Sequence, residues 1–414
     1  MILTLPRLAV GTIAALVALA VPATAPAAPA PQRLAGVGNW VWDYQQIGAP
    51  DAAKFHGATG VVITTQRHTA VALAAIHGQG ALAFSYLNMF WLPLGRVYDG
   101  VDLALHPGWR FCGTHHRPLS GRSTGAPGHM VTWAYPDLNE AGMRSAMLAY
   151  LRGLKADGYD GVFFDRGVVA LHHGTLPKAV STCTDDPVAA GATFAGAYAR
   201  IVRDARALGL HIVLNYGSGR LPGSVAGAVG RVMQEDAPRS SPAHDIALAF
   251  ARRAMESRRR TRYVEEVKTS RPGDRPGAFL AWTEVALWPF DVDINSGDTG
   301  CAGLPATSIC FHYGTFPELT GVRRGSAVSA APARSRCHGQ SATVCLWVRR
   351  WSQAVVAVNE TPRPVRAVLT VGAACRRVVD VWSGRRIAAG RCVRRFRVQI
   401  PPHSGRVYQE SARP

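Results

Sequence analysis

Lysine is scarce in this chain of 414 residues, whose only lysines are Lys54, Lys155, Lys178 and Lys268, although Lys and Arg together number 46. Asp and Glu number 27, so the formal net charge is +19 at pH 7. The arginines are spread over both halves of the chain, and no predicted helix gathers them between aromatic residues, so we expect no nucleic-acid partner. The charge favours partners with anionic groups, such as uronates or phosphorylated glycans.

Several signature motifs are missing as well. No GxGxxG or GxxxxGK follows any predicted strand, which argues against a dinucleotide or P-loop site. The chain has no CxxC, no HExxH and no zinc-like Cys/His spacing, and the adjacent pairs His115–His116 and His172–His173 would diverge in extended chain. We therefore expect no metal and no cofactor. The lack of GxSxG argues against an esterase.

Outside the amino terminus, no apolar run is long enough to cross a bilayer. Residues 1–27 combine Arg7, an apolar run from Leu8 to Val21, and small residues around Ala23 to Ala27, which is typical of a secretory signal peptide. A retained membrane anchor is the alternative, but this run is short and prolines follow it directly. We expect a secreted or extracytoplasmic monomer without an integral membrane segment after cleavage.

The eight cysteines of an exported chain favour disulfides over metal ligands. Proximity in the sequence favours four pairs, among many connectivities that remain open: Cys301 with Cys310, Cys337 with Cys345, Cys375 with Cys392, and Cys112 with Cys183.

Short apolar segments alternate with helical patterns over residues 28–331. The helix before Gly158, for example, has an apolar stripe of Met143, Met147, Tyr150, Leu151 and Leu154. Alternation on this scale predicts a (β/α)8 TIM barrel of the α/β class. The eight expected strands lie within Gly38–Tyr44, Gly60–His68, Ala81–Met89, Gly161–Phe164, His211–Gly219, Arg231–Asp236, Arg262–Val267 and Ser308–Gly314.

The pattern changes near residue 332. From there to residue 414 the segments are short, rich in Val, and divided by Pro, Gly and Arg, with no helical period. This is typical of a small antiparallel β-sandwich domain. We favour a role in stabilising the barrel over one in presenting sugar, because the segment offers no paired carboxylates.

Asp165 is the first catalytic candidate. The four residues before it, Gly161–Phe164, have no polar face, as in the central strand of a parallel barrel, and catalytic residues lie at the carboxyl ends of such strands. Taken alone, Asp165 could equally cap the following turn or pair with Arg166.

One reaction that uses carboxyl groups at such a rim is the cleavage of glycosides, which needs a second carboxyl group facing the first. Glu235 or Asp236, at the end of the sixth strand, could supply it. Strands four and six end roughly 10 Å apart, and two inward side chains would narrow this gap towards the ~5 Å of a retaining pair. Successive side chains point to opposite faces, so only one of the two acids enters the site. We favour Glu235, whose apolar neighbours Val232 and Met233 suit the raised pKa of an acid/base, with Asp165 as nucleophile.

Further polar residues end other strands on the same rim. They are candidates for an alternate acid or for binding sugar hydroxyls, although each alone could be structural: Asp43, Tyr86, Asn88, Asn215, Tyr216 and Glu265. Glu265 and its neighbour Glu266 end the seventh strand, and either one is a third acid or a salt-bridge partner of nearby arginines.

The chain resembles the hypothetical glycosyl hydrolase family 15, a family of secreted barrel glycosidases. The resemblance rests on WAYPDLNEAGMRSAMLAYLRGLKADGYDGVFFDRG (Trp133–Gly167), VMQED (Val232–Asp236), CFHYGTFPEL (Cys310–Leu319) and the terminal β domain. The GxDGxxxD strand ending in Asp165 also resembles barrels of the α-galactosidase and polygalactosaminidase kinds. The resemblance implies an O-glycosidase, either retaining or inverting.

Together these patterns predict a secreted glycoside hydrolase that cleaves O-glycosidic bonds of a polysaccharide or oligosaccharide with two carboxylates, retention being favoured. One alternative is a non-catalytic carbohydrate-binding protein of the cell envelope, with the same barrel but no productive geometry. A third reading is a structural envelope protein held by charge, which would attach in a salt-sensitive way.

Overall fold

Eight parallel strands close into a barrel in the order β1-β11-β10-β9-β8-β7-β3-β2. The computed structural model describes residues 37–43, 53, 55–64, 70–89, 92–95, 97, 100–112, 120–124, 130–172, 187–215, 221–234, 243–257, 262–268, 274–295, 316–338 and 344–410. The barrel strands are β1 (Asn39–Asp43), β2 (Gly60–Thr64), β3 (Leu82–Leu87), β7 (Gly161–Phe164), β8 (His211–Leu214), β9 (Arg231–Gln234), β10 (Tyr263–Lys268) and β11 (Asp291–Asn295). The predicted barrel is confirmed.

The eighth strand is not the expected one. β11 closes the barrel by pairing with β10 and β1, whereas Ser308–Gly314 lies outside the described residues. The sequence of β11, DVDIN, alternates acids with apolar residues and so lacks the apolar run that marks the other strands. The structure explains the pattern: Val292 packs on the outer side of the barrel, and Asp291 and Asp293 are buried on its inner side.

Strand side chains alternate between two separate cores. The barrel interior holds one cluster: Trp40, Trp42, Val62, Phe84, Phe163, Val213, Met233 and Val264. The intervening residues, such as Val162 and Phe164 of β7, join a larger cluster beneath the surrounding helices. All four residues of β7 are buried, as predicted. Gly161 is required there, because a Cβ atom would overlap the ring of Phe84.

The helices that cover the barrel are α1 (Ala70–Gly78), α2 (Ala141–Ala156), α3 (Gly167–His172), α4 (Pro187–Ala207), α5 (Gly223–Ala226), α6 (Ala243–Glu256), α7 (Arg275–Ala286) and α8 (Pro317–Thr320). On α2 four residues of the predicted stripe are buried, Met143, Met147, Leu151 and Leu154, and the fifth, Tyr150, is half-buried against the same core. A small sheet that the sequence did not reveal lies between β3 and α2, in the order β4 (Leu92–Pro93), β6 (Met130–Ala134) and β5 (Ser120–Thr124). Among the described residues, no helix has the length and apolar character of a membrane span.

Antiparallel strands form the carboxyl-terminal part of the chain, which is called the β module below. One sheet has the order β12-β13-β14-β18-β16 and the other pairs β15 with β17. The strands are β12 (Ala333–Ser335), β13 (Leu346–Arg350), β14 (Ala354–Asn359), β15 (Val365–Thr370), β16 (Val378–Asp380), β17 (Arg395–Ile400) and β18 (Ser404–Glu410). The two sheets enclose a core that includes Leu346, Val355, Leu369, Phe396 and Ile400. This arrangement agrees with the predicted sandwich.

Two of the expected disulfides are present in the module, Cys337–Cys345 and Cys375–Cys392. Cys112 is also disulfide-bonded, while Cys183, Cys301 and Cys310 lie outside the described residues.

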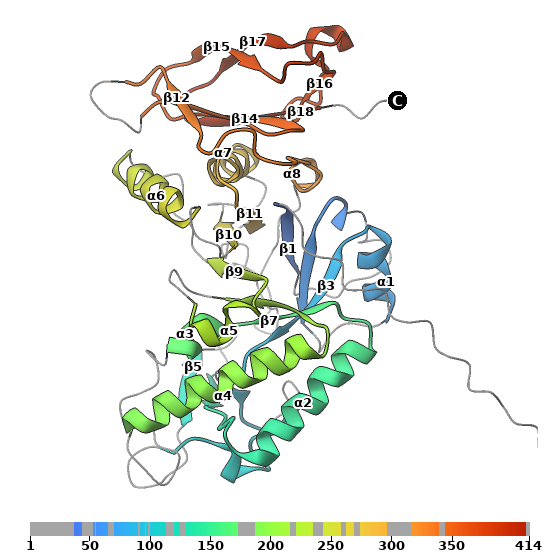
Figure 1. The fold of residues 1–414 in the computed structure, drawn as a ribbon, viewed down its shortest axis with the longest axis vertical. Helices are drawn as coiled ribbons and strands as arrows, with labels where there is room; N and C mark the ends of the chain where they lie inside the picture. Colours follow the sequence, from blue (N-terminus) through green and yellow to red (C-terminus); the bar gives the residue numbers. More distant parts are fainter. Residues whose placement is uncertain are drawn as a thin grey trace, which may run out of the picture.

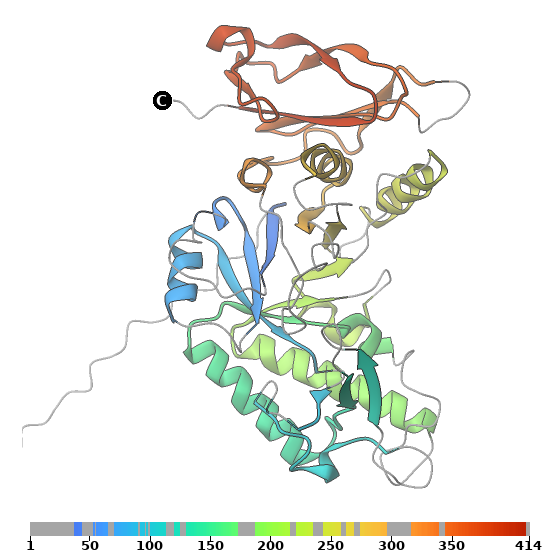
Figure 2. The same ribbon diagram turned by 180° about the vertical axis from the view of Figure 1, so that it is seen from behind.

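The β module packs on the barrel through α7, which lies between them in both views of the fold (Figures 1 and 2). The indole of Trp351 donates to the carbonyl of Ala286 (3.1 Å), and the Arg349 guanidinium donates to the carbonyl of Leu287 (2.7 Å). The Arg324 guanidinium lies 5.5 Å from the ring of Trp282 and 5.1 Å from that of Trp351. These carbonyls end α7 without helical partners, so the module supplies hydrogen bonds that the helix end needs.

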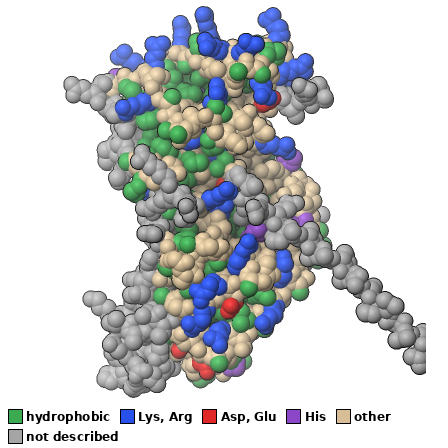
Figure 3. All heavy atoms as spheres, viewed as in Figure 1, with side chains coloured by type: hydrophobic (Ala, Val, Ile, Leu, Met, Phe, Trp, Pro, Cys, Tyr) green, Lys and Arg blue, Asp and Glu red, His purple; other side chains and the backbone are tan. Residues whose placement is uncertain are grey.

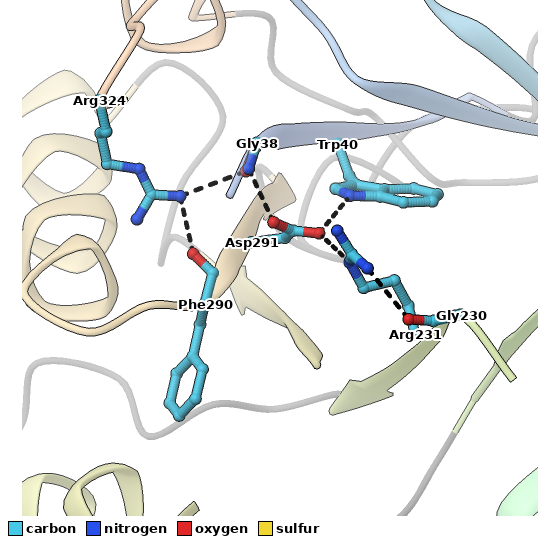
Figure 4. A network of polar contacts seen from close by, with 7 residues as sticks. All are labelled: Gly38, Trp40, Gly230, Arg231, Phe290, Asp291 and Arg324. Atoms are coloured by element: carbon cyan, nitrogen blue, oxygen red, sulfur yellow. Dashed lines mark hydrogen bonds and ion pairs between the residues drawn. The ribbon is translucent and has the colours of Figure 1, made fainter. Parts of the chain in front are cut away.

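A buried ion pair joins β9, β11 and β1 inside the barrel (Figure 4). The Asp291 carboxylate accepts from the Arg231 guanidinium (2.5 Å), the Trp40 indole (3.0 Å) and the Gly38 amide (2.7 Å). Arg324 donates to the carbonyls of Phe290 (2.7 Å) and Gly38 (3.3 Å) beside it. Because Arg231 and Asp291 are both 2% exposed, each charge relies on the other.

Replacing Asp291 with Ala should lower the free energy of unfolding by about 3–5 kcal/mol, because Arg231 would stay buried without its counter-charge. Urea titration measures this loss. Glu410→Gln, which removes the partner of Arg376 in a half-exposed pair, is the control and should cost less than about 1 kcal/mol. An Asp291→Ala protein as stable as the control would contradict this role.

A second prediction concerns Glu284 of α7 and Glu360, which follows β14; both are buried. Burial raises the pKa of Glu284 well above 4.5, and the neighbouring charge of Glu360 raises it further. Above about pH 4.5 the unfolded chain loses this proton while the folded protein keeps it, so stability falls as the pH rises. Glu284→Gln should flatten this decline in urea titrations at several pH values. An unchanged slope would contradict the assignment.

Candidate active site

Asp165 follows β7 directly, and its carboxylate is held from both flanking strands. One oxygen accepts the hydroxyl hydrogen of Tyr86 on β3 (2.5 Å), and the other accepts the side-chain amide of Asn215, the residue after β8 (2.6 Å). Both oxygens thus act as acceptors, as those of an ionised carboxylate do. The structure therefore brings three of the predicted site residues together. Asp165 is half-buried.

Aromatic rings form the floor beneath this carboxylate. Phe163 lies two residues before Asp165 and points into the barrel interior. Its ring centroid is 5.7 Å from that of Tyr86 and 4.9 Å from that of Trp42. Asp165 follows this layer at the carboxyl ends of the strands, which is the end of such barrels where ligands bind.

The backbone around Asp165 is fixed by hydrogen bonds to both neighbouring strands. The amide of Asp165 donates to the carbonyl of Leu87, and the amide of Asn215 donates to that of Phe164, both at 2.8 Å. The next residue, Arg166, has φ +53°, in the left-handed region that side-chain-bearing residues seldom adopt. Such strain is typical of functional turns.

Tyr135, directly after β6, lies near Arg166 and was not a sequence candidate. Burial raises the pKa of its phenol, and the positive charge of Arg166 partly offsets that rise. The small sheet that places Tyr135 has no strong apolar period, so the sequence carried no clear signal for it.

Glu265 does not join this group. It is fully buried and forms an ion pair with Arg253 of α6 (2.8 Å), with Arg252 at 3.7 Å, on the helix side of β10. Of the two alternatives that the sequence left open, Glu265 is therefore the salt-bridge partner. The expectation that it is a further acid of the site is wrong. The reason is alternation, because Val264 lies in the barrel interior and its neighbour Glu265 points the other way.

By the same alternation, Glu266 shares the inward face of β10 with Val264. Its register partner on β11 is Asp293, which is in turn paired with Trp40 of the interior cluster. Both acids are buried, with exposed fractions of 5% and 1%. Two inward carboxyl groups thus lie side by side on the wall of the barrel opposite β7. Asp293 was missed because its strand was not recognised.

The remaining candidates are placed only in part. Asn88 follows β3 and is buried. Asp43 ends β1, as predicted, but its side chain is not described. Three further candidates lie outside the described residues: Tyr216, Glu235 and Asp236. Within the described ranges, no cluster of three or more His, Cys, Asp or Glu residues could hold a metal ion.

No protein-family model and no curated protein matches the chain. Several solved structures share its fold. The trehalose-6-phosphate hydrolase of Bacillus licheniformis is 10% identical, with 91% of this chain and 99% of that chain covered and a TM-score of 0.53. The alpha-amylase of H. orenii has the same identity and TM-score, with 91% and 100% covered. An Anoxybacillus alpha-amylase is 6% identical, with 91% and 98% covered and a TM-score of 0.51.

These neighbours are glycoside hydrolases, and at such identities the likeness shows the fold alone. It extends over the barrel and the β module, since the coverage reaches 91% of the chain. The resemblance to the hypothetical glycosyl hydrolase family 15 stays a prediction.

Proposed function

We propose that the protein is a secreted glycoside hydrolase that cleaves O-glycosidic bonds of a polysaccharide or oligosaccharide. The observation that carries the proposal is the anchored carboxylate of Asp165, held by Tyr86 and Asn215 at the carboxyl end of a central barrel strand. The glycosidase fold of the structural neighbours supports the reaction class. The disulfides of the β module fit an oxidising, extracytoplasmic setting.

In this proposal Asp165 is the nucleophile. Its two hydrogen bonds fix the direction of the carboxylate, which suits attack on an anomeric carbon bound at the carboxyl end of the barrel. Attack forms a glycosyl ester and breaks the bond to the leaving oxygen, and water then hydrolyses the ester, so configuration is retained overall.

We assign the acid/base role to Glu235, with Asp236 as the alternative. What supports Glu235 is the alternation of β9, where Val232 lies in the outer core and Met233 in the barrel interior. Continued two residues beyond Met233, this alternation would give the inward position to Glu235 and the outward position to Asp236. β9 is two strands from β7, roughly 10 Å, and two inward side chains can narrow this gap towards the ~5 Å between the carboxyl groups of a retaining pair.

Asp165→Asn should lower turnover by about 10⁴-fold or more on any glycan that the protein cleaves, because the nucleophile is lost. Release of reducing ends from a panel of neutral and anionic glycans measures it. Asp160→Asn is the matched control: this acid precedes the same strand at the opposite end of the barrel, where it accepts from the Ala83 amide and contacts His77. It should keep turnover within about threefold.

If no glycan in the panel is cleaved while one is bound, the barrel is a carbohydrate-binding protein and the hydrolase proposal fails. Equal losses in the two variants would show that Asp165 has no specific role.

Glu235→Gln should reduce turnover by about 10²–10⁴-fold on a natural glycan, whose leaving oxygen needs a proton. The loss should be much smaller on an aryl glycoside whose phenol leaves without protonation. Asp236→Asn is the control and should show neither effect. The reverse result, with the dependence on the leaving group found only in Asp236→Asn, would transfer the acid/base role to Asp236.

A further inference from the structure

The β module contains a cleft of about 570 Å³ at one edge of its sandwich, far along the chain from Asp165. The cleft lies between the edge strand β12, its neighbour β13, and β15 of the second sheet. Its lining includes Ser335, Leu346, Val348 and Val368, together with Arg336, Arg350 and Arg366. A volume of this size is in the range of small-ligand sites.

Side-chain alternation on β13 separates this cleft from the barrel. Leu346, Val348 and Arg350 line the cleft, whereas Trp347 and Arg349 point the other way and pack on the barrel helices. The barrel-facing side of β13 is therefore held by packing, while its other side faces the core between the two sheets and borders the cleft at the edge of the sandwich.

The lining of the cleft has positive charge and no negative charge. Arg336 and Arg366 are exposed and Arg350 is half-exposed, and no acidic side chain lies among the lining residues. In the described part of the chain, none of the three forms an ion pair. The lining also has no aromatic ring on which a neutral sugar or a base could stack.

Arg336 is held in place by its surroundings. Its backbone has φ +54°, in the left-handed region, and the following residue, Cys337, is bonded to Cys345 at the start of β13. The amide of His338 donates to the carbonyl of Val344 (2.8 Å) across the same loop. These restraints fix the backbone that carries Arg336, so the loop loses less freedom when the guanidinium binds an anion.

The surface around the cleft is also basic. Residues 332–410 contain fifteen arginines but only three acids. Of these acids Glu360 is buried, Glu410 pairs with Arg376, and Asp380 accepts from Ser383. On the face shown in Figure 3, arginine side chains, drawn in blue, project from the module at the top of the picture. Next to the cleft, exposed Arg397 on β17 is the register partner of Val368.

We propose that this cleft binds an anionic glycan, with Arg336, Arg350 and Arg366 contacting its acidic groups. Guanidinium groups bind carboxylate, sulfate and phosphate oxygens through paired hydrogen bonds, and half-buried Val348 and exposed Val368 offer an apolar surface to the sugar ring. The site is separate from Asp165, so binding here does not depend on hydrolysis.

Titration calorimetry of the full chain carrying Asp165→Asn tests the site without cleavage. The probes are oligogalacturonate, a heparin oligosaccharide and a phosphorylated mannan fragment, with a neutral malto-oligosaccharide and single-stranded DNA of equal charge as comparisons. The cleft variant is Arg336→Gln/Arg350→Gln/Arg366→Gln. The control, Arg385→Gln/Arg386→Gln/Arg391→Gln, removes the same charge from exposed residues near β16, at the opposite edge of the sheet.

We expect saturable binding with one site per chain for at least one anionic glycan, weakened about tenfold by the cleft variant and less than about threefold by the control. The probe bound most tightly identifies the acidic group. Equal weakening by both variants would show general charge attraction and overturn the proposal. So would tighter binding of DNA, equal binding of the neutral glycan, or no binding of any anionic glycan.

A single substitution tests the same site in case the triple variant fails to fold. Val368 is 60% exposed in the cleft, so Val368→Glu adds a repelling charge without disturbing the core. It should weaken anionic glycan binding about threefold or more. Val71→Glu adds the same charge on α1, where Val71 is 54% exposed, and should leave binding unchanged. Identical affinities of these two variants would contradict the proposed site.

Discussion

The buried ion pair of Arg231 and Asp291 is the interaction on which the barrel depends most. It joins β9 to β11, and the same carboxylate holds the first residues of β1, so three strands are tied together where the sheet closes on itself. Nearby, Arg324 connects this end of the barrel to the β module through Trp351. Because the charges of Arg231 and Asp291 are buried, removing either one would leave the other buried without its counter-charge.

Alternation along each strand then decides which polar residues can do chemistry. Asp165, Tyr86 and Asn215 lie on three neighbouring strands and meet through two short hydrogen bonds. Glu265 and Glu266 are adjacent in sequence, yet one forms a structural ion pair with Arg253 and the other shares the inner face of the barrel. The same rule in β13 separates the packing face of the module from its arginine-lined cleft.

The sequence predicted what depends on apolar periodicity. β7, the stripe of α2, the sandwich and two disulfides follow from local patterns, and so does the position of Asp165. The eighth strand was misplaced because Asp291 and Asp293 interrupt its apolar pattern, and the sequence does not show that Arg231 and Trp40 on other strands meet the buried Asp291 carboxylate. The position of Tyr135 is set by a small inserted sheet, which the sequence did not predict because the apolar pattern of its strands is weak.

The central claim is that Asp165 attacks a sugar directly. Treating the purified protein with a set of activated fluorosugars, which slow hydrolysis of a glycosyl ester, and mapping the labelled peptide by mass spectrometry tests it most directly. The account predicts a single sugar adduct on Asp165, absent from the Asp165→Asn protein. An adduct on a different carboxylate, or turnover of these sugars without any covalent adduct, would contradict it.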